Sequence, residues 1–277
     1  MKAGAVIQRS IFAIATIGGT AYAQVITPLM ADRGSAHAAV ERRAHPSAVQ
    51  LQGLEYVIPE LIIGGDWTST IRLTNRGTTA IPTTNAYFLD NVGNSLAATF
   101  QTTYGNVVTD VGFSFSLPPG TMVEATFVGS TTAFGHAVID CCSEHGIYGE
   151  VVLRDRNATR PDFESVFPLE RPYALQCMLF DGRNGLSTVL YLVNESISTN
   201  QVAIDVVDVN NRILRTVNVA FTGLSSQIMT LGAIAPETIG IQGTLIIRGQ
   251  GSTGLVTATG LRINPSNSFT PLRAFVP

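Results

Sequence analysis

The most reactive side chains of this sequence gather in one stretch, HAVIDCCSEH, at residues 136–145. Its adjacent thiols, Cys141 and Cys142, lie just before His145, and thiolate and imidazole groups are zinc ligands. A structural zinc site needs four such ligands in a tetrahedron, and this spacing matches no common zinc motif. Neighbouring residues of a strand also point to opposite faces, which hinders joint ligation by two adjacent cysteines. We therefore predict no metal site here.

A third cysteine, Cys177, offers these thiols a different use. An exported chain meets oxidants that convert thiols into disulfides. We therefore expect a bridge from Cys141 or Cys142 to Cys177, with free thiols and a metal site as the alternatives. In the chain-entropy model, closing this loop of ~36 residues would stabilise the fold by about 3–4 kcal/mol. The odd thiol would stay free or pair elsewhere.

The sequence offers little for nucleophilic catalysis. There is no Gly-x-Ser-x-Gly elbow, and the GLSSQ segment around Ser225 lacks the closing glycine. Cys142 could pair with His145, but the spacing nominates no third group to orient that histidine. We predict that the protein is not an enzyme, and a thiol- or metal-dependent enzyme centred on Cys141, Cys142 and His145 is the least favoured alternative. No cofactor is expected, since no glycine-rich phosphate loop lies between a strand and a helix.

The segments that would position these residues have the pattern of strands. In WTSTIRLTN (Trp67–Asn75), apolar and polar residues alternate, which marks a half-buried strand with Trp67 on its inward, core-facing side. Turns at residues 90–94 and 118–120 are expected to close hairpins. The segments FGHAVID and GIYGEVVLRD are expected to pair with each other. No helical period of useful length occurs, so the chain is predicted to be all-β.

Two aspartates begin segments that raise the question of calcium. Asp90 opens DNVGN and Asp208 opens DVNN, and both segments are rich in oxygen ligands. They lack the number of ligands that a calcium loop supplies, however. Asp and Asn side chains in such positions are what hairpin turns require. We predict turns at both places.

Three blocks of the sequence recur in the same order. The strand ending at Asn75 matches STVLYLVN, which ends at Asn194, 119 residues later. Asp90 matches Asp208 at an offset of 118, and Gly135 matches Gly243 at an offset of 108. The fall in offset predicts extra residues in the first copy between Leu96 and Gly135. We predict two tandem β-sandwich domains, at residues 55–170 and 171–277, each of an ordinary size for such a fold.

The second copy of the repeated strand is apolar on both of its faces. Val189 and Tyr191 replace the polar Thr70 and Arg72 of the first copy. A strand that is apolar on both sides is usually covered on both sides. We expect the first domain to pack against it, and the alternative is an exposed patch offered to a partner.

The glycine pair at residues 64–65, the following Trp67 and the alternation that ends on Asn75 resemble the opening of tandem immunoglobulin-like modules in secreted bacterial proteins. The resemblance extends from Tyr56 to the C-terminus, although the second copy has Leu186 in place of the tryptophan. It implies an immunoglobulin-like fold, export and extracellular interaction. It transfers no catalytic residue.

The N-terminus predicts export. Lys2 and Arg9 precede an apolar run, and AYA at residues 21–23 has the form of a signal-peptidase site. Residues 1–23 are therefore predicted to be a signal peptide and residues 24–54 a flexible tether. The mature chain would contain no membrane span. It would carry 15 basic and 20 acidic residues, a formal charge of −5 that argues against nucleic acid as a partner.

These observations predict an exported, non-catalytic protein for adhesion, surface assembly or protein interaction, in the periplasm or outside the cell. Its partner would be another protein or a glycan at the cell surface. A carbohydrate-binding module is the alternative, although such modules usually present aromatic platforms and Trp67 is the only tryptophan. No pattern supports the remaining candidate aromatic contacts, which are Tyr87, Tyr104, Tyr148 and Tyr191.

Overall fold

The computed structural model describes residues 56–103, 105–140, 146–156, 162–250, 254–266 and 268–277. The predicted signal peptide and tether, together with Cys141, Cys142, His145 and Tyr104, lie outside this part of the chain. The described residues form four antiparallel sheets, which confirms the all-β prediction. Helix is confined to single turns: α2 (Leu231–Ile234), η1 (Arg183–Gly185) and η2 (Pro236–Thr238). None of the helices in the described ranges has the length and apolarity needed to cross a bilayer.

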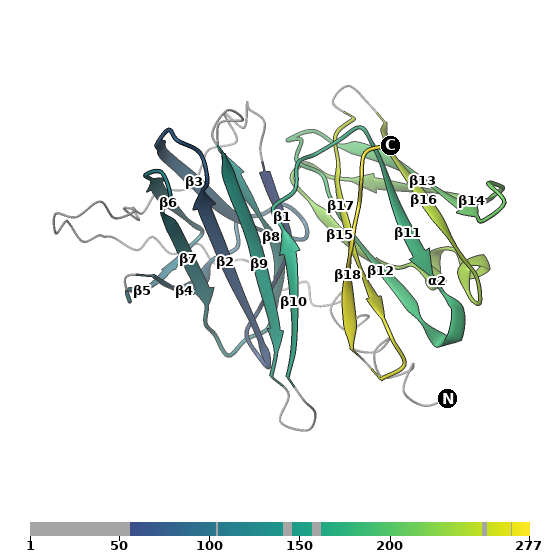
Figure 1. The fold of residues 1–277 in the computed structure, drawn as a ribbon, viewed down its shortest axis with the longest axis horizontal. Helices are drawn as coiled ribbons and strands as arrows, with labels where there is room; N and C mark the ends of the chain where they lie inside the picture. The colour runs from purple at the N-terminus through teal and green to yellow at the C-terminus, as the bar shows by residue number, and fades with distance from the viewer. Residues whose placement is uncertain (1–55, 104, 141–145, 157–161, 251–253, 267) are drawn as a thin grey trace.

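The first half of the chain forms two sheets (Figure 1). The β1 sheet has the strand order β1-β8-β3-β6, and the β2 sheet has the order β10-β9-β2-β7-β4-β5. The strands are β1 (Tyr56–Ile63), β2 (Trp67–Asn75), β3 (Ile81–Asp90), β4 (Ala98–Thr102), β5 (Val107–Asp110), β6 (Gly112–Leu117), β7 (Met122–Phe127), β8 (Ala133–Asp140), β9 (Ile147–Asp155) and β10 (Phe163–Pro168).

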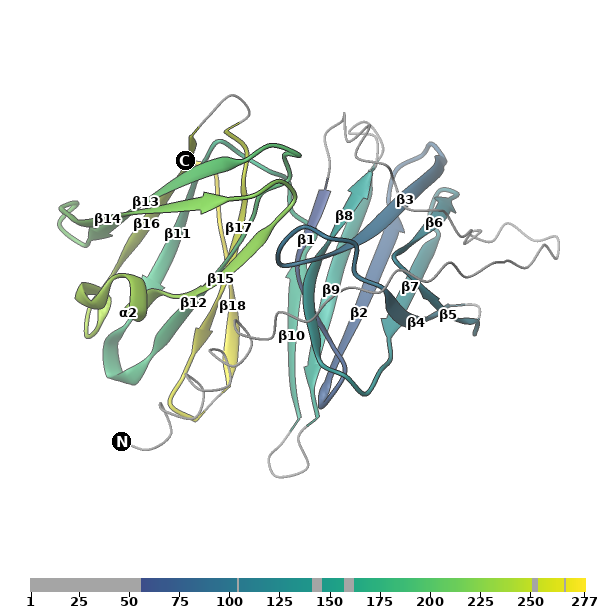
Figure 2. The ribbon, with the colours of Figure 1, turned by 180° about the vertical axis from the view of Figure 1, so that it is seen from behind.

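The second half forms the other two sheets, which lie to one side of the first half in both views (Figures 1 and 2). The β11 sheet has the order β11-β16-β13-β14, and the β12 sheet has the order β15-β12-β17-β18. The strands are β11 (Leu175–Asp181), β12 (Ser187–Val193), β13 (Asn200–Asp208), β14 (Ile213–Phe221), β15 (Ser226–Thr230), β16 (Gln242–Gln250), β17 (Thr257–Ile263) and β18 (Phe269–Arg273).

The core of the first half lies between its two sheets. Phe88 of β3 meets two rings of the β2 sheet edge-on, with centroids 5.5 Å away at Phe100 and 4.8 Å away at Phe127. Edge-to-face contacts at this distance are a favoured geometry for aromatic pairs. The predicted alternation of β2 is confirmed, because Ile71 and Leu73 are fully buried and the residues between them are partly exposed. The two sheets therefore bury one face each against a shared apolar layer.

Both predicted turns occur, but only the turn at residues 90–94 closes a hairpin, a short one in which Leu89 pairs antiparallel with Ser95. The turn at residues 118–120 joins β6 to β7, which belong to different sheets. The segments FGHAVID and GIYGEVVLRD form β8 and β9, which also lie in different sheets, so their predicted pairing is wrong. A period of two shows only that each strand has one apolar face. Whether the next strand pairs beside it or faces it across the core depends on contacts with distant strands.

The two halves pack together through β12, the apolar strand of the second half. Val189 and Tyr191 of β12 are 1% and 6% exposed and belong to the same apolar cluster as the core of the first half. The ring of Tyr191 meets Phe167 of β10 with centroids 6.2 Å apart. This confirms that the first half covers the second face of β12. A polar contact adds to the junction, because Ser226 Oγ lies 3.0 Å from Asn91 Oδ1.

Candidate functional site

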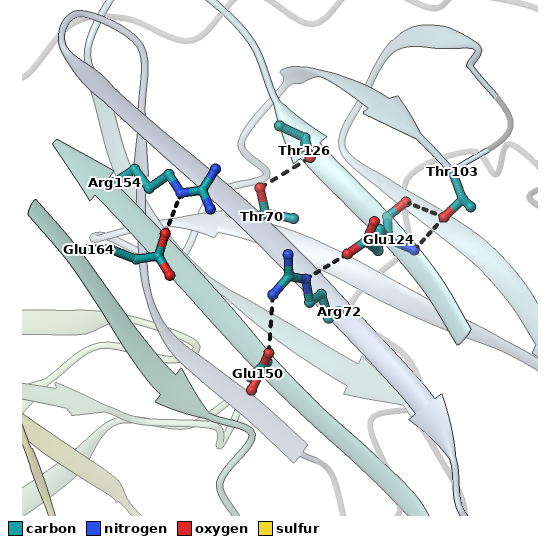
Figure 3. A network of polar contacts seen from close by, with 8 residues as sticks. All are labelled: Thr70, Arg72, Thr103, Glu124, Thr126, Glu150, Arg154 and Glu164. Atoms are coloured by element: carbon teal, nitrogen blue, oxygen red, sulfur yellow. Dashed lines mark hydrogen bonds and ion pairs between the residues drawn. The ribbon is translucent and has the colours of Figure 1, made fainter. Parts of the chain in front are cut away.

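The outer face of the β2 sheet is hollowed and lined largely by polar side chains. Side chains of β2 alternate, so the inward Ile71 and Leu73 leave Thr70, Arg72 and Thr74 on the face turned away from the core. The neighbouring strands β7 and β9 add glutamates to that face. Figure 3 shows Thr70, Arg72 and the two glutamates on adjacent strands.

Arg72 is the centre of the network. Its Nε donates to Glu124 Oε1 on β7 at 2.6 Å, and its Nη1 donates to Glu150 Oε1 on β9 at 3.5 Å (Figure 3). The register of the sheet places both glutamates directly opposite Arg72, which is the favourable position for opposite charges. The hydrogen bond to Glu124 is the main reason that the pKa of Arg72 is raised. The side chain is 37% exposed, so each ion pair contributes at most about 1 kcal/mol.

Two further contacts extend this arrangement along the sheet. The hydroxyls of Thr70 and Thr126 lie 3.1 Å apart, and Arg154 Nε donates to Glu164 Oε2 at 2.5 Å (Figure 3). The backbone nitrogen of Glu124 also donates to Thr103 Oγ1 at 2.7 Å. Guanidinium, carboxylate and hydroxyl groups are thus held at neighbouring positions of a rigid sheet.

The outer face contains two adjoining hollows, which we call the polar groove. Their volumes are about 420 and about 460 Å³, and Arg72 and Glu124 line both of them. Together they are lined by Gly65, Trp67, Thr68, Thr70, Arg72, Thr74, Arg76, Met122, Glu124, Thr126, Phe127, Val128, Gly129, Tyr148, Glu150, Arg154 and Arg156.

An aromatic residue lines each end of the polar groove. Trp67 is only partly buried and stacks on Phe269 of the second half, with ring centroids 5.9 Å apart and planes 28° apart. Its prediction as a core residue is therefore only partly right, since its ring spans the edge of the core and the junction of the halves. Tyr148 at the other end is 42% exposed. The guanidinium of Arg76 lies 4.0 Å above the Tyr148 ring centroid.

The lining of the polar groove is positively charged, although the whole chain is acidic. Four arginines line it against two glutamates, whereas the formal charge of the full sequence is −3. Within the described residues, Arg76 and Arg156 form no ion pair, and both are exposed. The groove therefore combines fixed, neutralised groups at its centre with unpaired guanidinium groups toward its ends.

The predicted cysteine chemistry receives no support. Cys177 is a free thiol that is 8% exposed, and burial raises its pKa. Cys141 and Cys142 lie outside the described residues. His136 is fully buried in β8, neither ring nitrogen has a hydrogen-bond partner, and desolvation lowers its pKa to about 3. Across the described ranges, no three His, Cys, Asp or Glu side chains gather in a way that would hold a metal ion.

The two aspartates act in turns, as predicted. Asp90 Oδ1 accepts hydrogen bonds from the backbone nitrogens of Val92 at 3.0 Å and Asn94 at 2.8 Å. Asp208 Oδ1 accepts from the nitrogens two and four residues later, both at 2.9 Å. Each carboxylate accepts hydrogen bonds from the backbone of its own turn, and this role accounts for an aspartate at both positions without a calcium ion.

The carboxyl group of Glu60 is buried where the halves meet. Glu60 of β1 is 1% exposed, and its Oε1 has no hydrogen-bond partner. Desolvation raises its pKa well above the ordinary value. Burial, together with the nearby Glu60 carboxyl, also raises the pKa of Tyr191. Both shifts favour the neutral form of the group, and neither residue lines the polar groove.

The sequence analysis did not identify the polar groove. Its central arginine was recognised only as an outward residue of a strand, and its glutamates lie 52 and 78 residues away along the chain. A usable signal was present in the alternation of Thr and Arg on β2. Comparison with family models, with curated proteins and with solved structures found no match, so the interpretation of this site depends on its own geometry.

Proposed function

We propose that this chain is an exported, non-catalytic binding protein made of two copies of one β unit, in which the first copy binds a surface partner at the polar groove and the second copy is its support. The proposed copies are residues 55–170 and 171–277. The proposal rests chiefly on one observation: equivalent faces of the two halves are used differently.

The strand orders support the duplication. When β1, β2, β3, β6, β7, β8, β9 and β10 are replaced by β11 to β18 in turn, β1-β8-β3-β6 becomes β11-β16-β13-β14. The same replacement turns β10-β9-β2-β7 into β18-β17-β12-β15. The strands left over, β4 and β5, fall between Leu96 and Gly135, where the change in sequence offset requires extra residues.

The side-chain hydrogen bonds of Asn75 and Asn194 also support the duplication. Asn75 is fully buried, donates from Nδ2 to the carbonyls of Thr79 and Leu117, and accepts from the backbone nitrogen of Gly77, all at 2.8 Å. Asn194 is also fully buried, and two of its bonds reach the groups four and two residues later, as in Asn75, while its third partner lies 28 residues away instead of 42. Its partners are the carbonyls of Ser198 at 3.0 Å and Thr222 at 2.8 Å, and the nitrogen of Ser196 at 3.2 Å.

The equivalent glycines have the same surroundings. A Cβ atom on Gly135 would lie 2.1 Å from the carbonyl oxygen of Leu89. A Cβ atom on Gly243 would lie 2.0 Å from the carbonyl oxygen of Val207. Such a distance excludes a side chain, so the same close approach of two strands explains glycine at both positions.

The immunoglobulin-like interpretation fits the layered, antiparallel architecture but not the strand order. In an immunoglobulin domain the first and second strands are neighbours in one sheet, whereas β1 pairs with β8 here. The order β1-β8-β3-β6 facing β2-β7-β4-β5 is that of a jelly roll, an eight-stranded fold of two Greek keys. We propose that each unit is a jelly-roll variant, complete in the first half and lacking one hairpin in the second.

The use of equivalent faces supports a binding role for the first half. On β12, Val189 and Tyr191 are buried against the first half. At the equivalent positions of β2, Thr70 and Arg72 line an open groove. The open face holds the Arg72 guanidinium between two carboxylates, whereas the counterpart Tyr191 is buried. Preorganised polar groups of this kind reduce the entropy that a ligand must lose on binding.

A blocking variant tests the proposal. Labelled full-length chain would be sedimented with bacterial envelope and capsule preparations, and the bound fraction measured. We expect Thr70→Trp to abolish binding, because the new ring fills the centre of the groove. Asn218→Trp, on the exposed face of β14, is the matched control and should bind normally. Equal binding of Thr70→Trp and the natural chain, or no binding by either, would contradict the proposal.

Carbohydrate binding is the second candidate function, and the groove itself favours it. Hydroxyl, carboxylate and guanidinium groups line the groove together. Clefts that recognise small polar ligands place a few such groups at defined positions. A hydroxyl-bearing ligand would find both donors and acceptors here. An array of immobilised glycans that retains no labelled chain would argue against this function.

A further inference from the structure

We infer that the ligand of the polar groove is an extended, anionic polysaccharide that lies along β2 and is held at each end by an unpaired arginine. This inference rests on the proposed function, because it names the chemical class of the ligand for the same surface. It follows from the backbone of β2, the charges of the lining and the length of the groove.

The backbone of β2 excludes one common mode of binding. From Thr70 to Thr74, β2 pairs with β7 on one side and with β9 on the other. No edge is open there, so a peptide could not be added to the sheet as an extra strand, the mode in which main-chain hydrogen bonds supply affinity. Only side chains meet a ligand at this face. A polymer whose own substituents carry the polar groups suits such a face better than a peptide backbone.

The charges indicate an acidic ligand. Four arginines and two glutamates line the groove, and Glu164 pairs with the lining residue Arg154, which leaves one positive charge in excess. Arg72 has five N–H donors, of which the network uses Nε and one on Nη1. Arg76 and Arg156, near opposite ends of the groove, have no carboxylate partner within the described ranges. Arginine is the side chain best matched to carboxylate geometry.

The remaining lining indicates a sugar rather than an isolated anion. Between the arginines lie the hydroxyls of Thr68, Thr70 and Thr126 and the carboxylates of Glu124 and Glu150. Carboxylates repel an anion but accept hydrogen bonds from hydroxyl groups. A chain that carries both hydroxyls and spaced carboxylates satisfies both sets of groups.

The dimensions indicate a linear polymer. The groove follows β2, whose nine residues extend over about 30 Å at the usual rise of a strand. Trp67 lines one end and Tyr148 the other. An isolated monosaccharide would contact only a fraction of this length, and the guanidiniums of Arg76 and Arg156 could not both reach it.

Calorimetric titration of the full chain with three probes tests the inference. The probes are an oligogalacturonate hexamer, the neutral cellohexaose and the acidic peptide hexaglutamate. We expect oligogalacturonate to bind tightest and to weaken as salt is added. Arg76→Ala and Arg156→Ala should each reduce its affinity about tenfold or more, since each removes a charge-assisted contact. Arg212→Ala, an exposed arginine in a turn of the second half, is the matched control and should change nothing.

The possible outcomes separate this inference from the proposed function. Equal binding of cellohexaose would overturn the acidic ligand, and equal binding of hexaglutamate would overturn the polysaccharide. If no probe binds while Thr70→Trp still abolishes envelope binding, the inferred ligand class is wrong, but the polar groove remains the proposed binding face. If the arginine variants bind oligogalacturonate as well as the natural chain does, the arrangement along β2 is wrong.

Discussion

Replacement of Asn75 and Asn194 is the sharpest test of the proposed duplication. Asn75→Ala removes two donated hydrogen bonds and one accepted bond, all at 2.8 Å, from a side chain that is fully buried. A typical buried hydrogen bond contributes roughly 0.5–1.5 kcal/mol net, so three of them predict a loss of about 2–4 kcal/mol in the free energy of unfolding. Asn194→Ala removes the equivalent bonds and should cost a similar amount.

The measurement is urea denaturation followed by fluorescence, with the slope of the transition compared between variants. Asn218→Ala, at an exposed position of β14, is the control and should stay within about 0.5 kcal/mol of the natural chain. A loss below about 1 kcal/mol for either buried asparagine would refute the hydrogen-bond argument. A large loss at Asn75 with none at Asn194 would refute the equivalence of the two halves.

Two further predictions concern the junction between the halves. Because burial raises the Glu60 pKa, the folded state favours the neutral carboxyl, so this residue makes the natural chain lose stability as pH rises above about 4.5. Glu60→Gln should remove that loss. Unfolding midpoints measured from pH 4 to 8 that change equally in both proteins would contradict this prediction. Tyr191→Ala should lower the free energy of unfolding by about 3–5 kcal/mol, as other large aromatic truncations do. It should also expose the segment between β10 and β11 to proteases. An unchanged digestion pattern would show that Tyr191 does not hold the halves together.

The sequence predicted the local features that depend on a few neighbouring residues. The alternation in β2 identified its buried face, and the aspartates at positions 90 and 208 identified turns whose carboxylates bond nearby backbone nitrogens. It also predicted that Val189 and Tyr191 would be covered by the first half. Each of these predictions rests on burial or on hydrogen bonds within four residues, which a periodic sequence records directly.

The sequence could not predict which strands pair. Two strands on either side of a tight turn have the same pattern whether they lie in one sheet or face each other across a core. The turn at residues 118–120 was therefore placed correctly, while the partners of β6 and β7 were not. Strand order depends on contacts between distant segments, and the free energy of those contacts is set by the whole core rather than by any turn.

The polar groove is a product of tertiary structure for the same reason. Sequence alone determined that Arg72 points away from the core, since its neighbours Ile71 and Leu73 must be buried. Only the register of β2 between β7 and β9 brought Glu124 and Glu150 to either side of it. A strand's own residues decide which side chains face outward, but the partners that those side chains meet come from strands that are remote in the chain.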